Sequence, residues 1–543
     1  MNRKLPVWHG QGERFGTFTR LISRTFFRWR LGGELQLISY QLILLLIGIS
    51  IFKDYGISWD EPENRNLGVI SFNYVFRGDK ALLNSDIHFN GVTFDLTCAT
   101  FEKVFGLTDT REIYLMRHLL NFLLFFTAVY FFYLLCKEYF NSWKTGLLGA
   151  TFFVLSPRIF ANAFYNDKDL VFLSFFVIGI YTLKKWLEEK SFSRTLLHAI
   201  VCGIIVDTRI VGVLIPAITV FILGLEFIFE RKHKTIKNEV IQLVLYFVIL
   251  AFFVILFWPA LWNNPILNFL RFLKRASHLN IPVLNLFQGS YVSSLNVPWY
   301  FIPWWIIITT PILYSVLFFI GVFSLLLSVV RSKSKAALSD KMKMNGVVLL
   351  WFFIPLLMTT IAKSAHYDSW RHVFFIYPAF LIFSLMGLNY GYNLFIKRTI
   401  IKLLIISIVA LSLLSTLFFM VTNHPHQDVY FNYLAGKGDN VRNNYDLDYW
   451  GLSNKEALEY ILKNDDRSLI KIYDDNNIAI KSSYLFNEID KKRLAFVNMN
   501  EADYFLTQYR WHKEDYNYPE YYSIKVDGIK IMTIYKLQCQ KIQ

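Results

Sequence analysis

Long apolar stretches alternate with short polar ones over the first four fifths of the chain, and this pattern predicts membrane-spanning helices. A helix crosses the hydrocarbon core of a bilayer with about 17–25 mostly apolar residues. Eleven stretches approach or reach this length, the third and fifth being short: 36–53, 115–136, 144–159, 170–186, 195–207, 210–229, 239–258, 303–330, 346–362, 373–395 and 400–421. The predicted fold class is a polytopic α-helical membrane protein, with a transmembrane domain over 1–422.

The pattern changes after residue 422, where shorter apolar runs predict a small α/β domain over 423–543. SNKEALEYILKN (453–464) is typical of a helix with Ser453 and Glu456 as a capping box. SLIKIYDD, ADYFLTQ and YYSIKVDGIKIMTIYKL are typical of strands. The last run predicts a hairpin that turns at Asp527–Gly528.

Composition and charge predict the orientation of the chain across the membrane. The 543 residues are 54% hydrophobic with a net charge of +15. With the N-terminus inside, the inner segments 1–33, 137–144, 184–194, 231–237, 331–343 and 397–402 hold about 25 Lys and Arg against about 5 Asp and Glu. The first outer loop, 54–113, holds about 5 against about 10. We therefore interpret the charge as a signal of topology rather than of nucleic-acid binding, and expect a multi-pass cell-membrane protein whose C-terminal domain lies outside.

Ionisable residues recur at the predicted outer ends of the spans. Three carboxylates, Asp60, Glu61 and Glu63, lie in GISWDEPENRNLG of the first outer loop. Later outer turns contribute Arg158, Asp167, Lys168 and Asp169, then Arg209, then Arg371 and His372. Ionisable groups at membrane depth are costly and commonly functional. The four cysteines show no CxxC spacing, so the sequence indicates neither a zinc site nor a disulfide framework.

Each of these residues also has a purely structural interpretation. Ser58 and Glu61 have the spacing of a capping box, and carboxylates suit a first helical turn. Asp167 could cap the fourth span, and Arg209 could extend to lipid headgroups. The functional interpretation rests on the combination, because carboxylates and cations in one leaflet can line one cavity. Arginines can hold a phosphate while a carboxylate takes a proton from a hydroxyl or amine.

The motifs resemble those of the GT-C superfamily of membrane glycosyltransferases. SWDEPENRNLG resembles the acidic pair after the first span, and NDKDLVFLSFFVIGIYTL resembles the second outer acidic site. YDSWRHVFFIYPAFLIFS resembles the entry to a late span in bacterial members of glycosyltransferase family 39. These include protein O-mannosyltransferase-like and lipid A aminoarabinose transferase-like enzymes. HPHQDVYFNYLAGKGDNVRNNYDLDYWGLSNKEALEYI (424–461) is similar to the segment that follows the last span in many of them.

The resemblance implies an inverting transfer of a sugar from a polyprenyl-phosphate carrier, undecaprenyl phosphate in bacteria, to a protein, lipid or glycan acceptor. It implies a catalytic role for Asp60, with Glu61 adjacent. It implies a second acidic site at Asp169 or its rival Asp167, and phosphate binding by Arg371. Lys168, Arg158, Arg209 and His372 are further phosphate-binding candidates. Metal stays unassigned, because some relatives bind a divalent metal ion between such carboxylates and others do not.

Other classes of function remain as alternatives. A lipid or sugar transporter or flippase typically places charges near the bilayer midplane and contains internal repeats. Here the charges lie at span ends, and the sequence shows no repeat. A non-catalytic envelope assembly protein has no need of both carboxylates and cations at the outer ends of its spans. An oligosaccharyltransferase is disfavoured, because no WWD tripeptide follows a late span.

Overall fold

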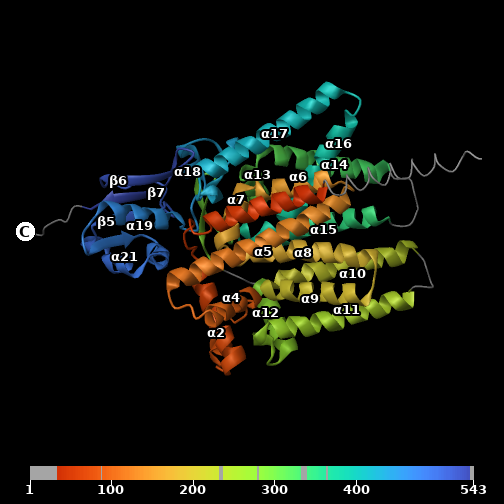
Figure 1. The fold of residues 1–543 in the computed structure, drawn as a ribbon, viewed down its shortest axis with the longest axis horizontal. Coiled ribbons are helices and arrows are strands. Elements are labelled where there is room, and N and C mark those ends of the chain that lie inside the picture. Colours follow the sequence, from red (N-terminus) through yellow and green to blue (C-terminus); the bar gives the residue numbers. More distant parts are fainter. Residues whose placement is uncertain are drawn as a thin grey trace, which may run out of the picture.

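The chain forms a bundle of long helices with a small sheet domain beyond one end, here called the domain end (Figure 1). The structure is a computed structural model that describes residues 33–86, 88–230, 236–277, 281–331, 339–361 and 365–537. The predicted inner segments 1–33 and 231–237 lie mostly outside these ranges. Within them, nine helical segments are long and apolar enough to cross a membrane: Gly33–Ile51, Thr110–Tyr139, Asp169–Glu188, Ile210–Phe229, Glu239–Phe257, Ile312–Val330, Asp340–Ile361, Arg371–Leu394 and Thr399–Thr422.

The structure confirms the predicted class of polytopic helical membrane protein and corrects two of the eleven spans. The third is bent by 69° between α6 (Trp143–Val154) and α7 (Pro157–Tyr165), with Pro157 as the first residue of the new helix. The eighth is broken between α13 (Phe301–Ile308) and α14 (Ile312–Arg331). The fifth, α9 (Phe192–Thr208), has 17 residues, which is the lower limit for a helix that spans a bilayer of about 30 Å.

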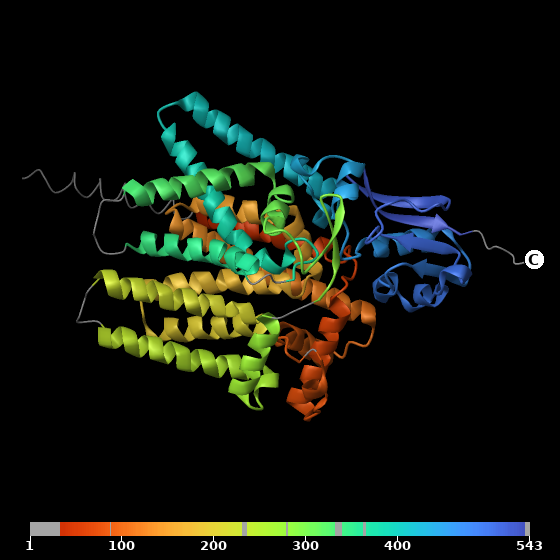
Figure 2. The same ribbon diagram turned by 180° about the vertical axis from the view of Figure 1, so that it is seen from behind.

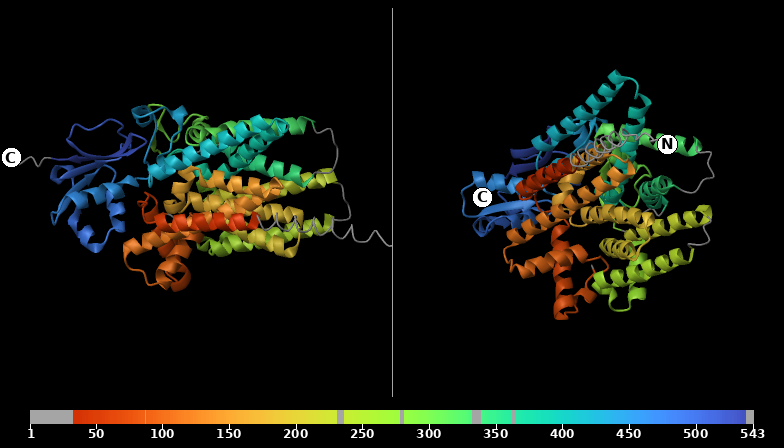
Figure 3. Two further views of the ribbon diagram at one scale, coloured as in Figure 1. Left: turned by 45° about the horizontal axis from the view of Figure 1, so that its top comes forward. Right: turned by 45° about the vertical axis from the view of Figure 1, so that its right-hand side comes forward.

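The remaining membrane helices follow the predicted order with small shifts of their ends. They are α5 (Thr110–Tyr139), α8 (Asp169–Glu188), η1 (Ile210–Val213) with α10 (Leu214–Glu230), α11 (Ile236–Phe257), α15 (Asp340–Ile361), η3 (Arg371–Ile376) with α16 (Tyr377–Leu394), and α17 (Thr399–Thr422). Figure 3 shows them running in similar directions, with the sheet domain beyond their ends.

The predicted first outer loop, 54–113, and later connections fold into short elements at the domain end. They are α2 (Glu61–Arg77), α3 (Ala81–Asn84), α4 (Thr93–Val104), η2 (Pro259–Leu261), α12 (Pro265–Ser277) and the hairpin β1 (Leu284–Phe287) and β2 (Ser290–Ser293). Seen from behind, the hairpin lies between the bundle and the sheet domain (Figure 2). Trp511 of the sheet domain donates its indole N–H to the Leu284 carbonyl at 3.1 Å.

The sheet domain contains the predicted strands and one more. Five strands lie in the order β4 (Leu494–Phe496), β3 (Ile470–Asp474), β5 (Tyr504–Thr507), β7 (Ile529–Lys536) and β6 (Glu520–Val526). The first three are parallel, whereas β7 runs antiparallel to both of its neighbours. Asp527 and Gly528 both have positive φ, which confirms the predicted hairpin turn.

The helix predicted over 453–464 is present as α19 (Ser453–Asn464), but its predicted capping box is wrong. The carboxylate of Asp448 accepts the backbone N–H groups of Gly451, Leu452 and Ser453 at 2.9–3.0 Å. Glu456 instead pairs with His426 at 2.8 Å. The shorter elements of this region are η4 (Gln427–Val429), η5 (Tyr433–Ala435), α18 (Asp439–Asn444), α20 (Ala479–Ser482), η6 (Ser483–Leu485), α21 (Glu488–Arg493) and η7 (Met499–Glu501).

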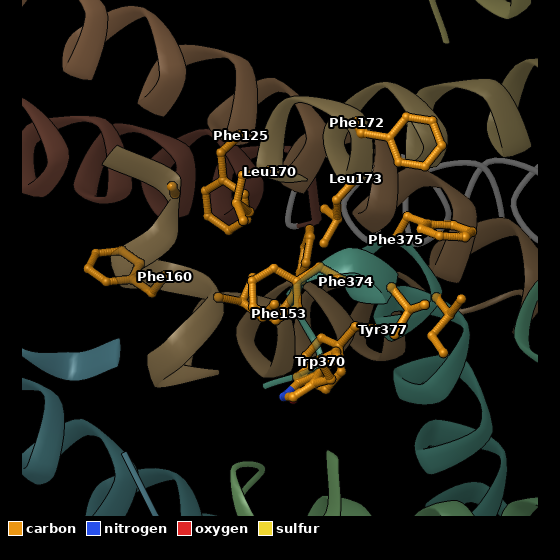
Figure 4. Packing of buried hydrophobic residues seen from close by; sticks show 14 of the residues in the cluster. Phe125, Phe153, Phe160, Leu170, Phe172, Leu173, Trp370, Phe374, Phe375 and Tyr377 are labelled. Carbon is orange, nitrogen blue, oxygen red and sulfur yellow. The ribbon is translucent and has the colours of Figure 1, made fainter. Parts of the chain in front are cut away.

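Aromatic side chains pack α8 against η3 and so fix the positions of both helix starts (Figure 4). The ring of Phe375 lies 5.0 Å from that of Phe172 and 4.9 Å from that of Phe176, and all three are buried. Trp351 donates its indole N–H to the Phe375 carbonyl at 2.7 Å. This packing brings Asp169, the first residue of α8, close to Arg371, the first residue of η3.

Candidate functional site

Arg371 joins two carboxylates from distant parts of the chain. Its Nη1 lies 2.8 Å from Oδ2 of Asp60, at the start of α2, and 3.5 Å from Oδ2 of Asp169, at the start of α8. The guanidinium is buried, and the Asp169 side chain is only 1% exposed. The Asp60 side chain is 31% exposed, so it is the carboxylate that an outside molecule can reach.

A second arginine holds Asp169 from the other side. Nη2 of Arg209 lies 2.8 Å from Oδ1 of Asp169, and its Nη1 donates to the His372 carbonyl at 3.3 Å. Arg209 follows α9, so three helix ends meet at this point. We define the Arg371 cluster as Asp60, Lys168, Asp169, Arg209 and Arg371.

Lys168 brings a third cation whose ammonium has no hydrogen-bond or ion-pair partner within the described ranges. The side chain is half-buried between α7 and α8. Burial and the neighbouring charge of Arg209 lower the pKa of Lys168, although Asp60 and Asp169 favour its charged form. An unpaired ammonium beside a guanidinium is well suited to an anion.

The cations keep Asp60 ionised. Burial alone raises the pKa of a carboxyl group, but Arg371, through its charge and its hydrogen bond, outweighs that effect and lowers the pKa of Asp60. Lys168 and Lys481 act in the same direction. Lys481 belongs to the sheet domain, where it donates to the Trp59 carbonyl at 3.1 Å and lies 4.4 Å from the centre of the Trp59 ring.

Asp368 links the Arg371 cluster to the sheet domain. Its Oδ2 lies 3.1 Å from Nη2 of Arg371, and its Oδ1 lies 2.6 Å from Nη2 of Arg510, which follows β5. All three side chains are less than 10% exposed. Sequence reasoning missed Arg510 and Lys481. Asp368 lies within the quoted motif YDSWRH, but Arg510 and Lys481 carry no signal in the sequence.

Glu61, which the resemblance placed beside the catalytic residue, lies apart from the Arg371 cluster. It is buried, its Oε1 lies 2.9 Å from Nε2 of His118, and its Oε2 accepts the Ser58 backbone N–H at 2.6 Å. The Ser58 hydroxyl donates to the Tyr165 carbonyl at 3.3 Å and does not accept a backbone N–H from the described first turn of α2. Only the Glu61 half of the expected capping box is therefore formed.

Asp167 belongs to a second, buried network. Its Oδ2 lies 2.6 Å from Nη2 of Arg117, which also lies 2.5 Å from Oδ1 of Asp95, and its Oδ1 accepts the Asn64 amide at 2.7 Å. Burial raises the pKa of Asp167 to about 8 even though Arg117 favours its ionised form. Of the two rivals for the second acidic site, Asp169 is the one beside Asp60 and Arg371.

Arg158 and His372 differ in how they relate to the cluster. Arg158 is buried among aromatic rings, 5.3 Å from the centre of Phe431 and 5.7 Å from that of Trp305, and donates to the Tyr430 carbonyl at 3.4 Å. It packs as a cation among aromatic rings and makes no hydrogen bond or ion pair with the residues of the Arg371 cluster within the described part of the chain. His372 adjoins the cluster through the carbonyl that Arg209 contacts, and its ring lies 4.6 Å from that of Tyr367.

The surroundings of Asp60 and Asp169 do not suit a resident divalent metal ion. A guanidinium occupies the position between the two carboxylates, and Arg209 and Lys168 add further positive charge. Within the described ranges there is no group of three His, Cys, Asp or Glu residues that could hold a metal. A metal ion between these two carboxylates would have to displace the Arg371 guanidinium, and we assign no step to a metal.

Comparison with known proteins agrees with the predicted resemblance. Residues 94–258 match the family model described as dolichyl-phosphate-mannose-protein mannosyltransferase. This match confirms the predicted resemblance to GT-C membrane glycosyltransferases. The matched region includes Asp167, Lys168, Asp169 and Arg209 but neither Asp60 nor Arg371. No curated protein matches the chain.

Two similar solved structures come from Archaeoglobus fulgidus. The apo oligosaccharyltransferase has 12% identity and a TM-score of 0.46 over 86% of this chain and 65% of that one. The archaeal oligosaccharyltransferase in complex with an inhibitory peptide and a dolichol-phosphate has 11% identity and a TM-score of 0.44 over 83% of this chain and 65% of that one. This chain thus covers less than two thirds of the length of either structure.

Proposed function

We propose that this protein is a glycosyltransferase that moves a sugar, with inversion, from a polyprenyl-phosphate carrier to an acceptor on the outer face of the membrane. The observation that supports this most is the Arg371 cluster. It places a reachable carboxylate, Asp60, against the guanidinium of Arg371, with a second guanidinium on the other side of Asp169 and the unpaired ammonium of Lys168 in the same cluster. A phosphate-linked sugar needs these two kinds of group side by side, a base for the acceptor and cations for the leaving phosphate.

The cations act as the phosphate site. Arg371 and Arg209 lie on either side of Asp169, and Lys168 directly precedes it, so one phosphate can be held by all three. Asp169 keeps both guanidinium groups oriented when no phosphate is bound. The polyprenyl tail then extends along the lipid-facing surface of the bundle. When the donor phosphate takes over part of the charge of Arg371, Asp60 loses some of the stabilisation that lowers its pKa and becomes a stronger base.

Asp60 acts as the general base. It takes the proton of the acceptor hydroxyl or amine as that oxygen or nitrogen forms a bond to the anomeric carbon. The bond between the anomeric carbon and the phosphate oxygen breaks at the same time. Its electron pair leaves with the polyprenyl phosphate, whose charge Arg371, Arg209 and Lys168 offset. Attack from the face opposite the phosphate inverts the anomeric centre.

Carrier release tests this proposal without knowledge of the acceptor. The full chain, purified in lipid nanodiscs, is incubated with labelled polyprenyl-phosphate sugars of several kinds, and free polyprenyl phosphate is measured. Wild-type protein should release the carrier from at least one donor by transfer or slow hydrolysis. Asp60→Asn should lower release by about a hundredfold or more, the usual contribution of a positioned base.

Glu63→Gln is the matched control, because Glu63 is exposed on the same helix, three residues from Asp60. It should release the carrier at the wild-type rate. Near-full activity of Asp60→Asn contradicts the assignment of the base. Movement of intact donor between leaflets, with no carrier released from any donor, contradicts the transferase and indicates a flippase.

A further inference from the structure

A cleft of about 400 Å³ lies where the sheet domain meets the first two membrane helices. Four cationic side chains line it from three segments: Lys53 after the first helix, Arg111 at the start of α5, and Lys455 and Lys463 on α19. Its apolar lining comes from Leu115, Leu462, Leu485 and Phe486. The residues of the Arg371 cluster are not among those that line this cleft.

The positive charge in the cleft is only partly balanced. Its two carboxylates already have partners, because Glu459 lies 3.6 Å from Lys455 and Asp490 lies 3.8 Å from Arg493. Within the part of the chain that the structure describes, Lys53, Arg111 and Lys463 have no ion-pair partner. The cleft therefore carries an excess of positive charge that an anion can neutralise.

Lys455 joins the two sides of the cleft. Its Nζ donates to the carbonyl oxygens of Lys53 and Asp54 at 2.7 and 2.9 Å, which ties α19 to the end of the first helix. Burial lowers the pKa of Lys455, whereas Glu459 and Asp54 favour its charged form and the more weakly acting Arg111 opposes it. A bound anion would offset the repulsion between these cations.

The cleft also lies beside the ends of two helices that are long and apolar enough to cross a membrane. Lys53 follows the last residue of the first spanning helix, Ile51, by two positions, and Arg111 is the second residue of the next. Lipid headgroups lie at the ends of such helices. Cations beside a partly apolar lining fit a ligand that presents a phosphate next to apolar or neutral groups.

We propose that this cleft is a second binding site, specific for a phosphate group at the membrane surface. The phosphate belongs either to an anionic lipid headgroup or to a soluble phosphate monoester, and the same cations recognise both. Arg111 and Lys463 contact the phosphate directly, and Lys455 remains on its carbonyl partners. Because these cations come from the bundle and from α19, a bound phosphate also fastens the sheet domain to the bundle.

The test uses the purified full chain in nanodiscs of phosphatidylcholine alone or mixed with phosphatidylglycerol. Lipid retained after extraction into detergent is counted by native mass spectrometry. A second arm titrates glycerol 3-phosphate into the phosphatidylcholine discs and follows the thermal unfolding midpoint. Arg111→Gln/Lys463→Gln removes two cleft cations. Lys437→Gln/Lys525→Gln removes two exposed cations elsewhere and is the matched control.

We expect retained phosphatidylglycerol, a raised unfolding midpoint, or both, and we expect the cleft variant to weaken binding about tenfold or more. The control should bind as the wild type does. A response to phosphatidylglycerol alone assigns the phosphate to a lipid, and a response to glycerol 3-phosphate alone assigns it to a soluble ligand. Binding that survives in the cleft variant, equal loss in the control, or no response in either arm overturns the proposal. Size-exclusion profiles of both variants confirm folding.

Discussion

Arg510 of the sheet domain lies 2.6 Å from Asp368, and Asp368 in turn lies 3.1 Å from Arg371, so a residue beyond the last span reaches the candidate site through one carboxylate. The loop that contains Asp368 and the loop that contains Arg510 both have non-glycine residues with positive φ. These are Asp368 (56°) and Ser369 (64°) in the first, and Tyr509 (61°) and Trp511 (65°) in the second. Such conformations cost about 1–3 kcal/mol each and persist where the surroundings enforce them. The contact between these strained loops thus joins the sheet domain to the site.

Arg510→Gln should lower turnover without unfolding the protein. Loss of the guanidinium frees one oxygen of Asp368, which then competes with Asp60 for Arg371 and shifts its position. A misplaced group in a reactive site costs on the order of ten- to a hundredfold in rate. The carrier-release assay should show a lower kcat with little change in KM. Arg510→Lys keeps the positive charge and should therefore have a kcat between those of Arg510→Gln and the wild type.

Lys513→Gln is the control for this prediction, because Lys513 lies in the same loop and donates to the Gly289 carbonyl at 2.9 Å, away from Asp368. A loss in Lys513→Gln as large as that in Arg510→Gln would show that the loop as a whole is responsible, not the contact with Asp368.

Lys168→Gln should weaken donor binding rather than chemistry. Its ammonium is the unpaired cation of the Arg371 cluster, so its removal leaves the ion pairs of Asp60 and Asp169 intact. A charge-assisted contact to phosphate is worth roughly tenfold in affinity. We expect KM for the polyprenyl-phosphate sugar to rise by about this factor. Lys80 is an exposed lysine within residues 54–113, so Lys80→Gln is the control and should leave KM unchanged. An unchanged KM in Lys168→Gln removes Lys168 from the phosphate site.

The pH dependence of kcat/KM should reflect the pKa of Asp60. Because Arg371 and its neighbouring cations lower this pKa, the free enzyme keeps its base ionised as the pH falls, and loses it only below the ordinary range of a carboxyl group. Between about pH 5 and about pH 8 the wild-type profile should therefore show no acid limb due to Asp60. Lys481→Gln removes one of the cations that lower the pKa, so any acid limb should move to higher pH. If the wild type shows an acid limb at higher pH and Lys481→Gln does not move it, that limb belongs to a group other than Asp60.

Hydropathy and charge were sufficient to predict the membrane helices, because a bilayer requires long apolar helices and tolerates few exceptions. Breaks within a span were harder to predict. The bend before α7 follows from Pro157, which begins a new helix, but its 69° angle depends on packing against neighbours. The break before α14 coincides with Thr309, Thr310 and Pro311, and a proline commonly ends one helix and begins the next, but hydropathy alone gives this stretch as a single span.

The residues of the candidate site could be named from the sequence, but not their partners. Asp60, Asp169 and Arg371 stand at predicted span ends, and the structure brings them together. The sequence could not predict that Asp169 and Asp167 belong to different networks of ion pairs, since both lie at the start of α8. It results from Arg117, about two turns inside α5, which holds Asp167 and Asp95 in a network of their own. Arg510 and Lys481 lie over a hundred residues away in an ordinary soluble domain, where single cations carry no functional signal.

Close helix packing leads to a last prediction, which concerns stability rather than activity. Helices α14 and α16 approach so closely that a Cβ on Gly387 would lie 2.0 Å from the Leu317 carbonyl oxygen, and one on Gly321 would lie 1.8 Å from that of Phe383. Membrane helices use small residues for such contacts. Gly387→Ala should therefore push the helices apart and destabilise the fold by about 1–3 kcal/mol, the usual cost of overpacking.

Gly391→Ala, one turn further along α16, is the matched control, because a Cβ there meets nothing within 4 Å. It should keep or raise stability by up to about 1 kcal/mol, since alanine favours helix over glycine. Thermal unfolding of the two variants in the same detergent separates the effects of contact and of helix propensity. Equal midpoints for Gly387→Ala and Gly391→Ala would mean that α14 and α16 can move apart at no cost, and that their close contact does not stabilise the bundle.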